Sequence, residues 1–290
     1  MQWSGFGTAR LGRVVALAVV LVAVTACEEE RPPPDEGFHY AAIGDSFTAA
    51  PDLPTINSNG CHRSDHNYPH LVAKQLEDAT LTDASCGGAR TDAVLQSQDI
   101  QTEGRVVPPQ IDAVSATTDL VTVGLGVNDL DFASTVAFGC LLLAASDPDG
   151  SPCKDQEAKK VPRLLEKIQI AYVETIEAIA NRAPDARILA IGYPRLLAEG
   201  SSCPDVFPLA EGDFDFVRES YDQLNATVEA AAGEAGVEYV DVAAASEGHD
   251  ICSDDPWING DKDDKKSGAA AYHPMPAEQS AVADLILGLL

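Results

Sequence analysis

The chain has 290 residues, of which 45% are hydrophobic and 22% charged, and its formal net charge is −27. This composition is typical of one medium-sized globular domain, and it argues against a disordered chain. The large excess of acids argues against nucleic acid and anionic lipid headgroups as partners, because both are themselves negatively charged.

Residues 1–26 predict a signal peptide. Two arginines precede an apolar run from Val14 to Val24, which is too short to span a membrane as a helix. The run ends in Val-Thr-Ala-Cys, which resembles the lipobox of bacterial lipoproteins. We therefore expect lipidation of Cys27 and an extracytoplasmic or secreted protein; an ordinary signal peptide is the alternative. The charged, proline-rich residues 27–37 predict a tether, and residues 38–290 predict one folded domain.

The other six cysteines favour disulfides, because their number is even and the protein is expected to be exported. Six cysteines allow fifteen pairings, and we favour the one that joins neighbours along the chain, since each bond then closes one long loop. A zinc site is the alternative, but the chain has no Cys-x-x-Cys or Cys-x-x-His pair. We expect neither a metal nor another cofactor. The favoured pairs are Cys61–Cys86, Cys140–Cys153 and Cys203–Cys252.

Short β-like runs alternate with helical ones after residue 37. The clearest helix is predicted over Val161–Asn181, where apolar residues recur at spacings of three and four, and Ala183-Pro184 ends it. Such alternation predicts a parallel sheet covered by helices on both faces, with a ligand at the carboxyl ends of the strands. Strands are predicted over Phe38–Ile43, Thr80–Ala84, Asp119–Gly124, Arg187–Gly192 and Val237–Val242, and further helices over Tyr68–Leu76, Phe214–Ala232 and Ala277–Leu289.

A Gly-Asp-Ser turn follows the first predicted strand and presents Ser46. It is either an ordinary turn or the position of a nucleophile, which needs a base and donors for an oxyanion. Gly88, Asn128 and His273 offer a backbone N–H, a side-chain amide and an imidazole. Each has an ordinary explanation as a turn, a helix cap or a loop residue. Because all four follow strands or open a helix at one expected edge, we favour a catalytic site.

Four blocks, GDSFTA, SCGGART, GVND and HP, occur in an order that resembles the SGNH or GDSL-type hydrolases. The segments CHRSDHNYPHLVAKQL and PWING resemble their secreted actinobacterial esterase and lipase branch. The resemblance implies a three-layer α/β/α fold with a flavodoxin-like five-stranded parallel sheet, and supports sequential disulfides. It implies that Ser46 is the nucleophile, that its N–H forms the oxyanion hole with Gly88 and Asn128, and that His273 is the general base of an acyl-enzyme mechanism.

The chain departs from the family pattern before the histidine. Many members have an aspartate three residues earlier, where this chain has Ala270. Some members use a main-chain carbonyl instead, so the resemblance implies a Ser-His dyad in which the Ala270 carbonyl orients His273. The alternative is that Asp263 or Asp264 folds back to the imidazole, although their mixed-charge surroundings predict a solvated loop.

We therefore predict a lipid-anchored esterase or lipase, a monomer that acts on a small-molecule, lipid or polymer ester. A carbohydrate O-deacetylase is the alternative among enzymes, and a non-catalytic lipoprotein that binds esters or glycans is the alternative outside them. His62, His66 and His70 are expected to be surface histidines at the cleft rather than metal ligands. Trp257 and Tyr68 are expected either to line the site or to pack in the core.

Overall fold

The computed structural model describes residues 1–2, 5, 37–53 and 60–290. The predicted signal peptide, Cys27 and the tether up to residue 36 lie outside these described residues. Among the helices of the described part, none has the length and the apolar character needed to cross a membrane. The account below concerns the unit Glu36–Leu290.

Five parallel strands form the central sheet in the order β2-β1-β5-β6-β7. The sheet strands taken in chain order therefore follow the flavodoxin-like order 2-1-3-4-5, and the predicted α/β class and parallel sheet are confirmed. In the register of the sheet, Ala41 lies opposite Thr82 on one side and Val121 on the other. The strands are β1 (Phe38–Gly44), β2 (Ala79–Asp83), β5 (Leu120–Gly124), β6 (Arg187–Ile191) and β7 (Glu238–Val240).

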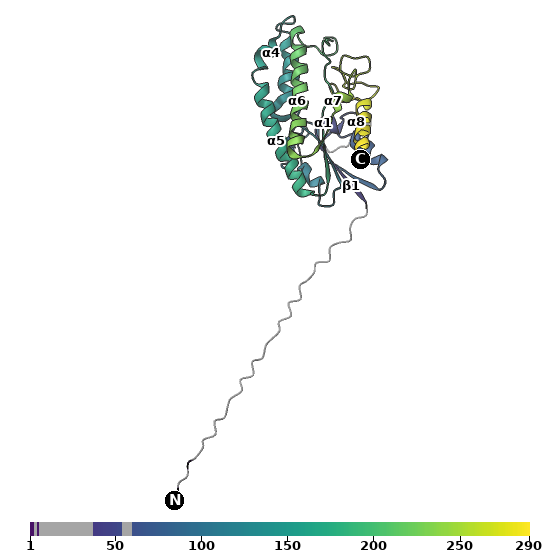
Figure 1. Cartoon of the computed structure of the whole chain (residues 1–290). Coiled ribbons are helices and arrows are strands. Elements are labelled where there is room, and N and C mark those ends of the chain that lie inside the picture. Colours follow the sequence, from purple (N-terminus) through teal and green to yellow (C-terminus); the bar gives the residue numbers. More distant parts are fainter. Residues whose placement is uncertain (3–4, 6–36, 54–59) are drawn as a thin grey trace. The chain divides into compact units, whose positions relative to one another are not determined.

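Helices cover both faces of the sheet because side chains alternate along each strand. Ala41 and Ile43 pack with residues of α5 and α6, whereas Tyr40 and Ala42 pack with residues of α2 and α8. Figure 1 shows α5 and α6 on one side of the sheet and α8 on the other. The bounds are α2 (Tyr68–Gln75), α5 (Val161–Arg182), α6 (Phe214–Ala235) and α8 (Pro276–Leu289), which confirms the predicted helices to within three residues at each end.

The structure differs from the prediction at the last strand and in the connections. The last strand ends at Val240, because Asp241 caps the short helix α7 (Val242–Ala245) through a hydrogen bond from Ala244 N–H (2.9 Å). An antiparallel hairpin of β3 (Gln98–Ile100) and β4 (Arg105–Val107) was not predicted. Its strands are short and lack an apolar alternation, so no sequence signal marks them.

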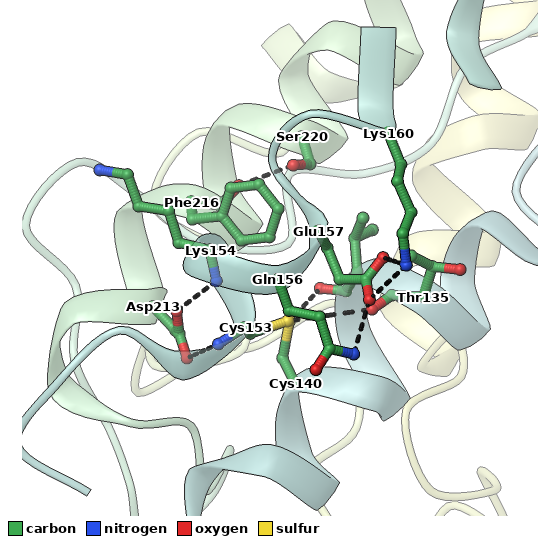
Figure 2. The surroundings of a disulfide bond; sticks show 11 residues. Thr135, Cys140, Cys153, Lys154, Gln156, Glu157, Lys160, Asp213, Phe216 and Ser220 are labelled. Carbon is green, nitrogen blue, oxygen red and sulfur yellow. Dashed lines mark hydrogen bonds and ion pairs between the residues drawn. A yellow bond between two sulfur atoms is a disulfide. The ribbon is translucent and has the colours of Figure 1, made fainter. Parts of the chain in front are cut away.

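The sequential disulfide pairing is confirmed, with bonds Cys61–Cys86, Cys140–Cys153 and Cys203–Cys252. The second bond joins α3 (Gly139–Ala144) to α4 (Pro152–Glu157), as Figure 2 shows. In the loop-entropy account each such bond adds about 3–4 kcal/mol to stability. Each bond therefore ties together two parts of the chain that lie between 13 and 49 residues apart.

Candidate active site

The chain passes directly from β1 into the short helix α1 (Ser46–Ala49), so that Ser46 is the first residue of that helix. The Asp45 carboxylate caps the helix by accepting a hydrogen bond from Phe47 N–H (2.8 Å). The turn can be this tight because Gly44 has no side chain: a Cβ there would lie 2.0 Å from Thr48 Oγ1. Ser46 is thus fixed at the carboxyl end of a parallel strand, where α/β sheets bind ligands.

A cavity of about 410 Å³ lies at this edge of the sheet. Ser46, Gly88, Asn128 and His273 all line it, so the fold brings the four predicted residues together. Much of the remaining wall is apolar or aromatic, which suits a ligand with a hydrocarbon part. This part of the wall includes Val127, Phe138, Leu196, Phe207, Ile258 and Tyr272.

Three N–H donors are available at the cavity. The backbone N–H groups of Ser46 and Gly88 have no acceptor within the described part of the chain. Gly88 has a φ of +72°, a left-handed conformation that favours glycine. Asn128 Nδ2 donates to the Ala89 carbonyl (3.1 Å), which leaves the second hydrogen of the amide free. Convergent donors of this kind can stabilise an oxyanion.

A buried carboxylate ties together the segments that carry Gly88 and Asn128. Asp129 Oδ2 accepts a hydrogen bond from Thr91 N–H (3.1 Å), and Asp129 Oδ1 accepts another from Thr91 Oγ1. Burial raises the pKa of Asp129 to about 6, although the hydrogen bonds from Thr91 favour the charged form. These hydrogen bonds therefore join the segment that carries Gly88 to the one that carries Asn128, a link that the sequence analysis did not predict.

A second buried network connects the turn before α1 with the segment after β5. Tyr193 Oη donates to Asp45 Oδ2 (2.6 Å) and accepts from Val127 N–H (3.1 Å). Burial raises the pKa of Asp45 to about 7, although hydrogen bonds from Tyr193 and Phe47 favour the carboxylate. Asn225 holds the backbone of Tyr193 by pairing with both its N–H (2.8 Å) and its carbonyl (3.0 Å). No motif in the sequence marks Tyr193 for this role.

His273 lies in a turn just before α8, and its Nδ1 donates to the carbonyl oxygen of Ala271 (2.8 Å). The prediction that Ala270 provides this acceptor is wrong by one residue. The Ala270 carbonyl instead accepts from the backbone N–H of His273 (3.3 Å) and from Asn259 Nδ2 (3.0 Å). The reason is a tight turn from Ala270 to His273, in which Tyr272 has a left-handed φ of +60°.

Burial lowers the pKa of His273 below its ordinary value of 6.5, so the imidazole is neutral near pH 7. The Ala271 carbonyl opposes this shift, as do the negative charges of Asp52 and Asp263. Asp263 Oδ1 accepts a hydrogen bond from Ala271 N–H (3.1 Å), whereas Asp264 accepts hydrogen bonds within its own loop. Among the described residues, no carboxylate is hydrogen-bonded to the imidazole ring.

The other residues singled out in the sequence differ in whether they line the cavity. Of the three early histidines only His62 lines the cavity, since His66 pairs with a neighbouring aspartate and His70 Nδ1 contacts an asparagine side chain (2.7 Å). Tyr68 and Trp257 are buried in the core and do not line the cavity. No group of side chains suited to a metal ion occurs in the part of the chain that the structure describes.

An aromatic wall of the cavity was not predicted. The Tyr272 ring lies 5.7 Å from the Phe138 ring and 5.6 Å from the Phe207 ring, measured between centroids. Phe138 ends a π-helical turn, whereas Phe207 and Tyr272 lie in two separate loops. No periodic pattern in the sequence links them, so only the fold reveals that they meet.

Comparison with known proteins gives a consistent result. The chain matches the GDSL-like lipase/acylhydrolase family over residues 42–279. It is 37% identical to Lipase 2 of Streptomyces coelicolor over 73% of this chain and 72% of that protein. It is 30% identical to Lipase 1 of the same organism over 92% of this chain and 91% of that protein.

Two solved structures resemble this one over most of its length. The extracellular lipase of Streptomyces rimosus is 27% identical with a TM-score of 0.71, and the match covers 88% of this chain and all 100% of that one. The phospholipase A1 of Streptomyces albidoflavus NA297 is 25% identical with a TM-score of 0.69, over 87% and 99% of the two chains. The chain therefore belongs to the GDSL-like lipase/acylhydrolase family and is a carboxylic-ester hydrolase.

Proposed function

We propose that this protein is a lipid-anchored, extracytoplasmic esterase or lipase that works through a Ser46–His273 dyad. The observation that supports the catalytic part of the proposal is the shared cavity, which both residues line together with Gly88 and Asn128. The anchor rests on the Val-Thr-Ala-Cys sequence that ends at Cys27. The acyl transfer requires a nucleophile, a neutral base and oxyanion donors at one place, and these are the groups that meet there.

In the first half of the reaction, Ser46 Oγ attacks the ester carbonyl carbon while His273 Nε2 takes the hydroxyl proton. The resulting oxyanion is stabilised by the N–H groups of Ser46, Gly88 and Asn128. His273 then donates its proton to the departing alkoxide, so the C–O bond to the alcohol breaks and an acyl-Ser46 ester remains.

In the second half, water attacks the acyl-enzyme. His273 takes one proton from that water, a second tetrahedral oxyanion forms, and its collapse returns the proton to Ser46 Oγ as the carboxylic acid leaves. The Ala271 carbonyl holds Nδ1–H throughout (2.8 Å), which keeps Nε2 as the basic nitrogen. The lowered pKa of His273 favours the neutral base near pH 7.

The character of the cavity wall favours acyl chains longer than acetyl. Phe138, Phe207 and Tyr272 offer hydrocarbon surface that an acetyl group would leave largely uncovered. Each methylene buried there adds about 0.8 kcal/mol, or about a fourfold gain in kcat/KM while the chain still fits the wall. A series of p-nitrophenyl esters of increasing length tests this, with acetylated xylan as the deacetylase substrate. Activity confined to acetyl esters would contradict the predicted preference for longer acyl chains and favour the O-deacetylase alternative.

The dyad is tested with single and double variants. Ser46→Ala and His273→Ala should each lower kcat by about 10⁴-fold or more, and the double variant should be hardly worse, because nucleophile and base act as a unit. Ser280→Ala and His66→Ala are matched controls outside the cavity and should retain wild-type rates. A Ser46→Ala protein that is folded and still active would exclude Ser46 as the nucleophile.

The anchor is tested separately from the chemistry. Metabolic labelling with a fatty acid should mark the wild-type protein, and Cys27→Ala should abolish the label and release the protein from the membrane fraction. Absence of label in the wild type would contradict lipidation of Cys27 while leaving the proposed chemistry untouched.

A further inference from the structure

An uncharged stretch borders the cavity. From Phe132 to Ser146 the sequence contains no Asp, Glu, Lys or Arg, although 22% of the chain is charged. The stretch forms a π-helical turn, η5 (Ser134–Phe138), followed directly by α3. In a soluble protein the outer face of such a segment is normally polar.

The outer face of this segment carries two large apolar side chains. Its inner residues, Val136, Ala137 and Cys140, are buried in the core. At roughly 100° per residue, Phe138 and Leu142 lie on the opposite face of the segment, one above the other. The exposed fraction is 44% for Phe138 and 84% for Leu142. We call these two side chains the docking face.

The segment is firmly attached to the protein beneath it. The disulfide Cys140–Cys153 joins α3 to α4, and the buried Asp213 carboxylate accepts hydrogen bonds from Cys153 N–H (3.1 Å) and Lys154 N–H (2.9 Å) at the start of α4. Figure 2 shows these contacts around the disulfide. The fold therefore holds the docking face in place on the outside of a braced segment.

The docking face is continuous with the cavity. Phe138 both lines the cavity and is partly exposed, and its ring contacts that of Tyr272 (5.7 Å between centroids), the residue before His273. Leu142 follows one helical turn later on the same face and does not line the cavity. An apolar surface thus leads from solvent to the place where the ester carbonyl reacts.

We propose that Phe138 and Leu142 are the site at which the enzyme docks on the surface of an electrically neutral lipid aggregate, so that an acyl chain passes from the aggregate into the cavity. This rests on the esterase or lipase function proposed above. Charge selects the partner: a protein with a net charge of −27 is repelled by anionic lipid, and the stretch contains no cation to offset that repulsion. A zwitterionic surface lacks this penalty and still accepts apolar side chains.

Binding is measured without chemistry or a lipid anchor. The unit Glu36–Leu290 contains the whole sheet, its core and all three disulfides, so it is used alone with Ser46→Ala in the background. In flotation with phosphatidylcholine vesicles, Leu142→Ser should bind about tenfold more weakly, the order expected for withdrawing one leucine from lipid. Ile170→Ser, which removes another exposed apolar side chain (55%) from α5, should bind as the parent does. Phosphatidylglycerol, an anionic lipid, should weaken binding of the parent when it is added to the vesicles.

Activity is measured in the unit with Ser46 intact. Leu142→Ser should leave kcat/KM on dissolved p-nitrophenyl butyrate unchanged and lower the rate on phosphatidylcholine vesicles about tenfold. The proposal would be overturned if Leu142→Ser and the parent bound vesicles equally, or if Ile170→Ser lost as much binding as Leu142→Ser. Tighter binding of the parent to anionic than to zwitterionic vesicles would also overturn it. A parent dimer in sedimentation that Leu142→Ser converts to monomer would also overturn it, since a second copy would then cover the face. A parent inactive on the dissolved ester would instead contradict the proposed function, while the binding result would still stand.

Discussion

Replacement of Asp263 by asparagine tests whether a carboxylate supports His273 and so turns the proposed Ser46–His273 dyad into a triad. Asparagine has nearly the same shape, and its Oδ1 can still accept the hydrogen bond from Ala271 N–H (3.1 Å). The substitution therefore removes a negative charge near His273 while it preserves the loop. If the Ala271 carbonyl alone orients the imidazole, the rate should depend little on that charge.

The size of the effect of Asp263→Asn on His273 follows from the exposure of the Asp263 side chain and from its position relative to the imidazole. The Asp263 side chain is exposed and is not hydrogen-bonded to the ring, so its interaction with the imidazolium is about 0.2–1 kcal/mol, as for exposed ion pairs. This corresponds to a fall of about 0.1–0.7 in the pKa of His273 and a change in kcat of a few-fold at most. Loss of the aspartate from a catalytic triad costs about 10⁴-fold in kcat.

The assay is kcat and kcat/KM for p-nitrophenyl butyrate as a function of pH. Removing the negative charge destabilises the imidazolium, so the acidic limb of kcat/KM should move to lower pH, and added salt should shrink the difference. Asp261→Asn is the matched control, because that carboxylate belongs to the same loop but pairs with Lys262 (3.4 Å). A fall in kcat of about 10³-fold or more in Asp263→Asn, with folding intact, would show that a carboxylate completes a triad.

Three further expectations concern the site. Asn128→Ala should lower kcat by about 10²–10³-fold with little change in KM, the usual cost of one oxyanion donor in steady-state kinetics. The kcat/KM of the wild type should fall as the pH decreases through the pKa of His273, with a midpoint below 6.5; a midpoint above 6.5 would contradict the burial argument. Tyr193→Phe removes the hydrogen-bond partner of the Asp45 carboxylate and of Val127 N–H, so denaturant titration should show that the free energy of unfolding falls by about 1–3 kcal/mol. That loss should be larger at pH 8 than at pH 5, because the pKa of Asp45 is about 7 and its charged form needs the donor most.

The regular elements could be predicted because their signals are local. Val161–Arg182 shows a helical period, and most of the apolar positions that recur at this period are buried along one face: Leu165, Ile168, Tyr172, Ile176 and Ile179. The strand predicted to end at Val242 ends at Val240 because a capping interaction by Asp241 competes for the same residues. Local capping chemistry can displace the end of an element in this way.

The four residues that meet at the cavity could be predicted from the order of four short blocks, but the contacts that hold them could not. The choice between the carbonyls of Ala270 and Ala271 depends on the left-handed φ of Tyr272, a conformation that a bulky residue rarely adopts. Tyr193 likewise reaches Asp45 and Val127 only because separate strands bring their ends together. Such contacts depend on the tertiary fold, which single-sequence patterns do not encode.

Support of the histidine by a carbonyl suits the surroundings of this site. A carboxylate placed beside a buried imidazole must lose its own hydration, whereas a carbonyl carries no net charge and costs less to bury. The carbonyl carries less charge than a carboxylate, but hydrogen bonds from Asn259 hold its loop rigid. The Asn259 backbone N–H donates to the His273 carbonyl (2.9 Å). The Asn259 side-chain Nδ2 donates to the carbonyls of Lys262 (2.8 Å), Ala269 (2.9 Å) and Ala270 (3.0 Å). One buried amide thus fixes the loop on both sides of the turn, so the imidazole is oriented by backbone geometry while the more distant acids supply a weaker, solvent-screened field.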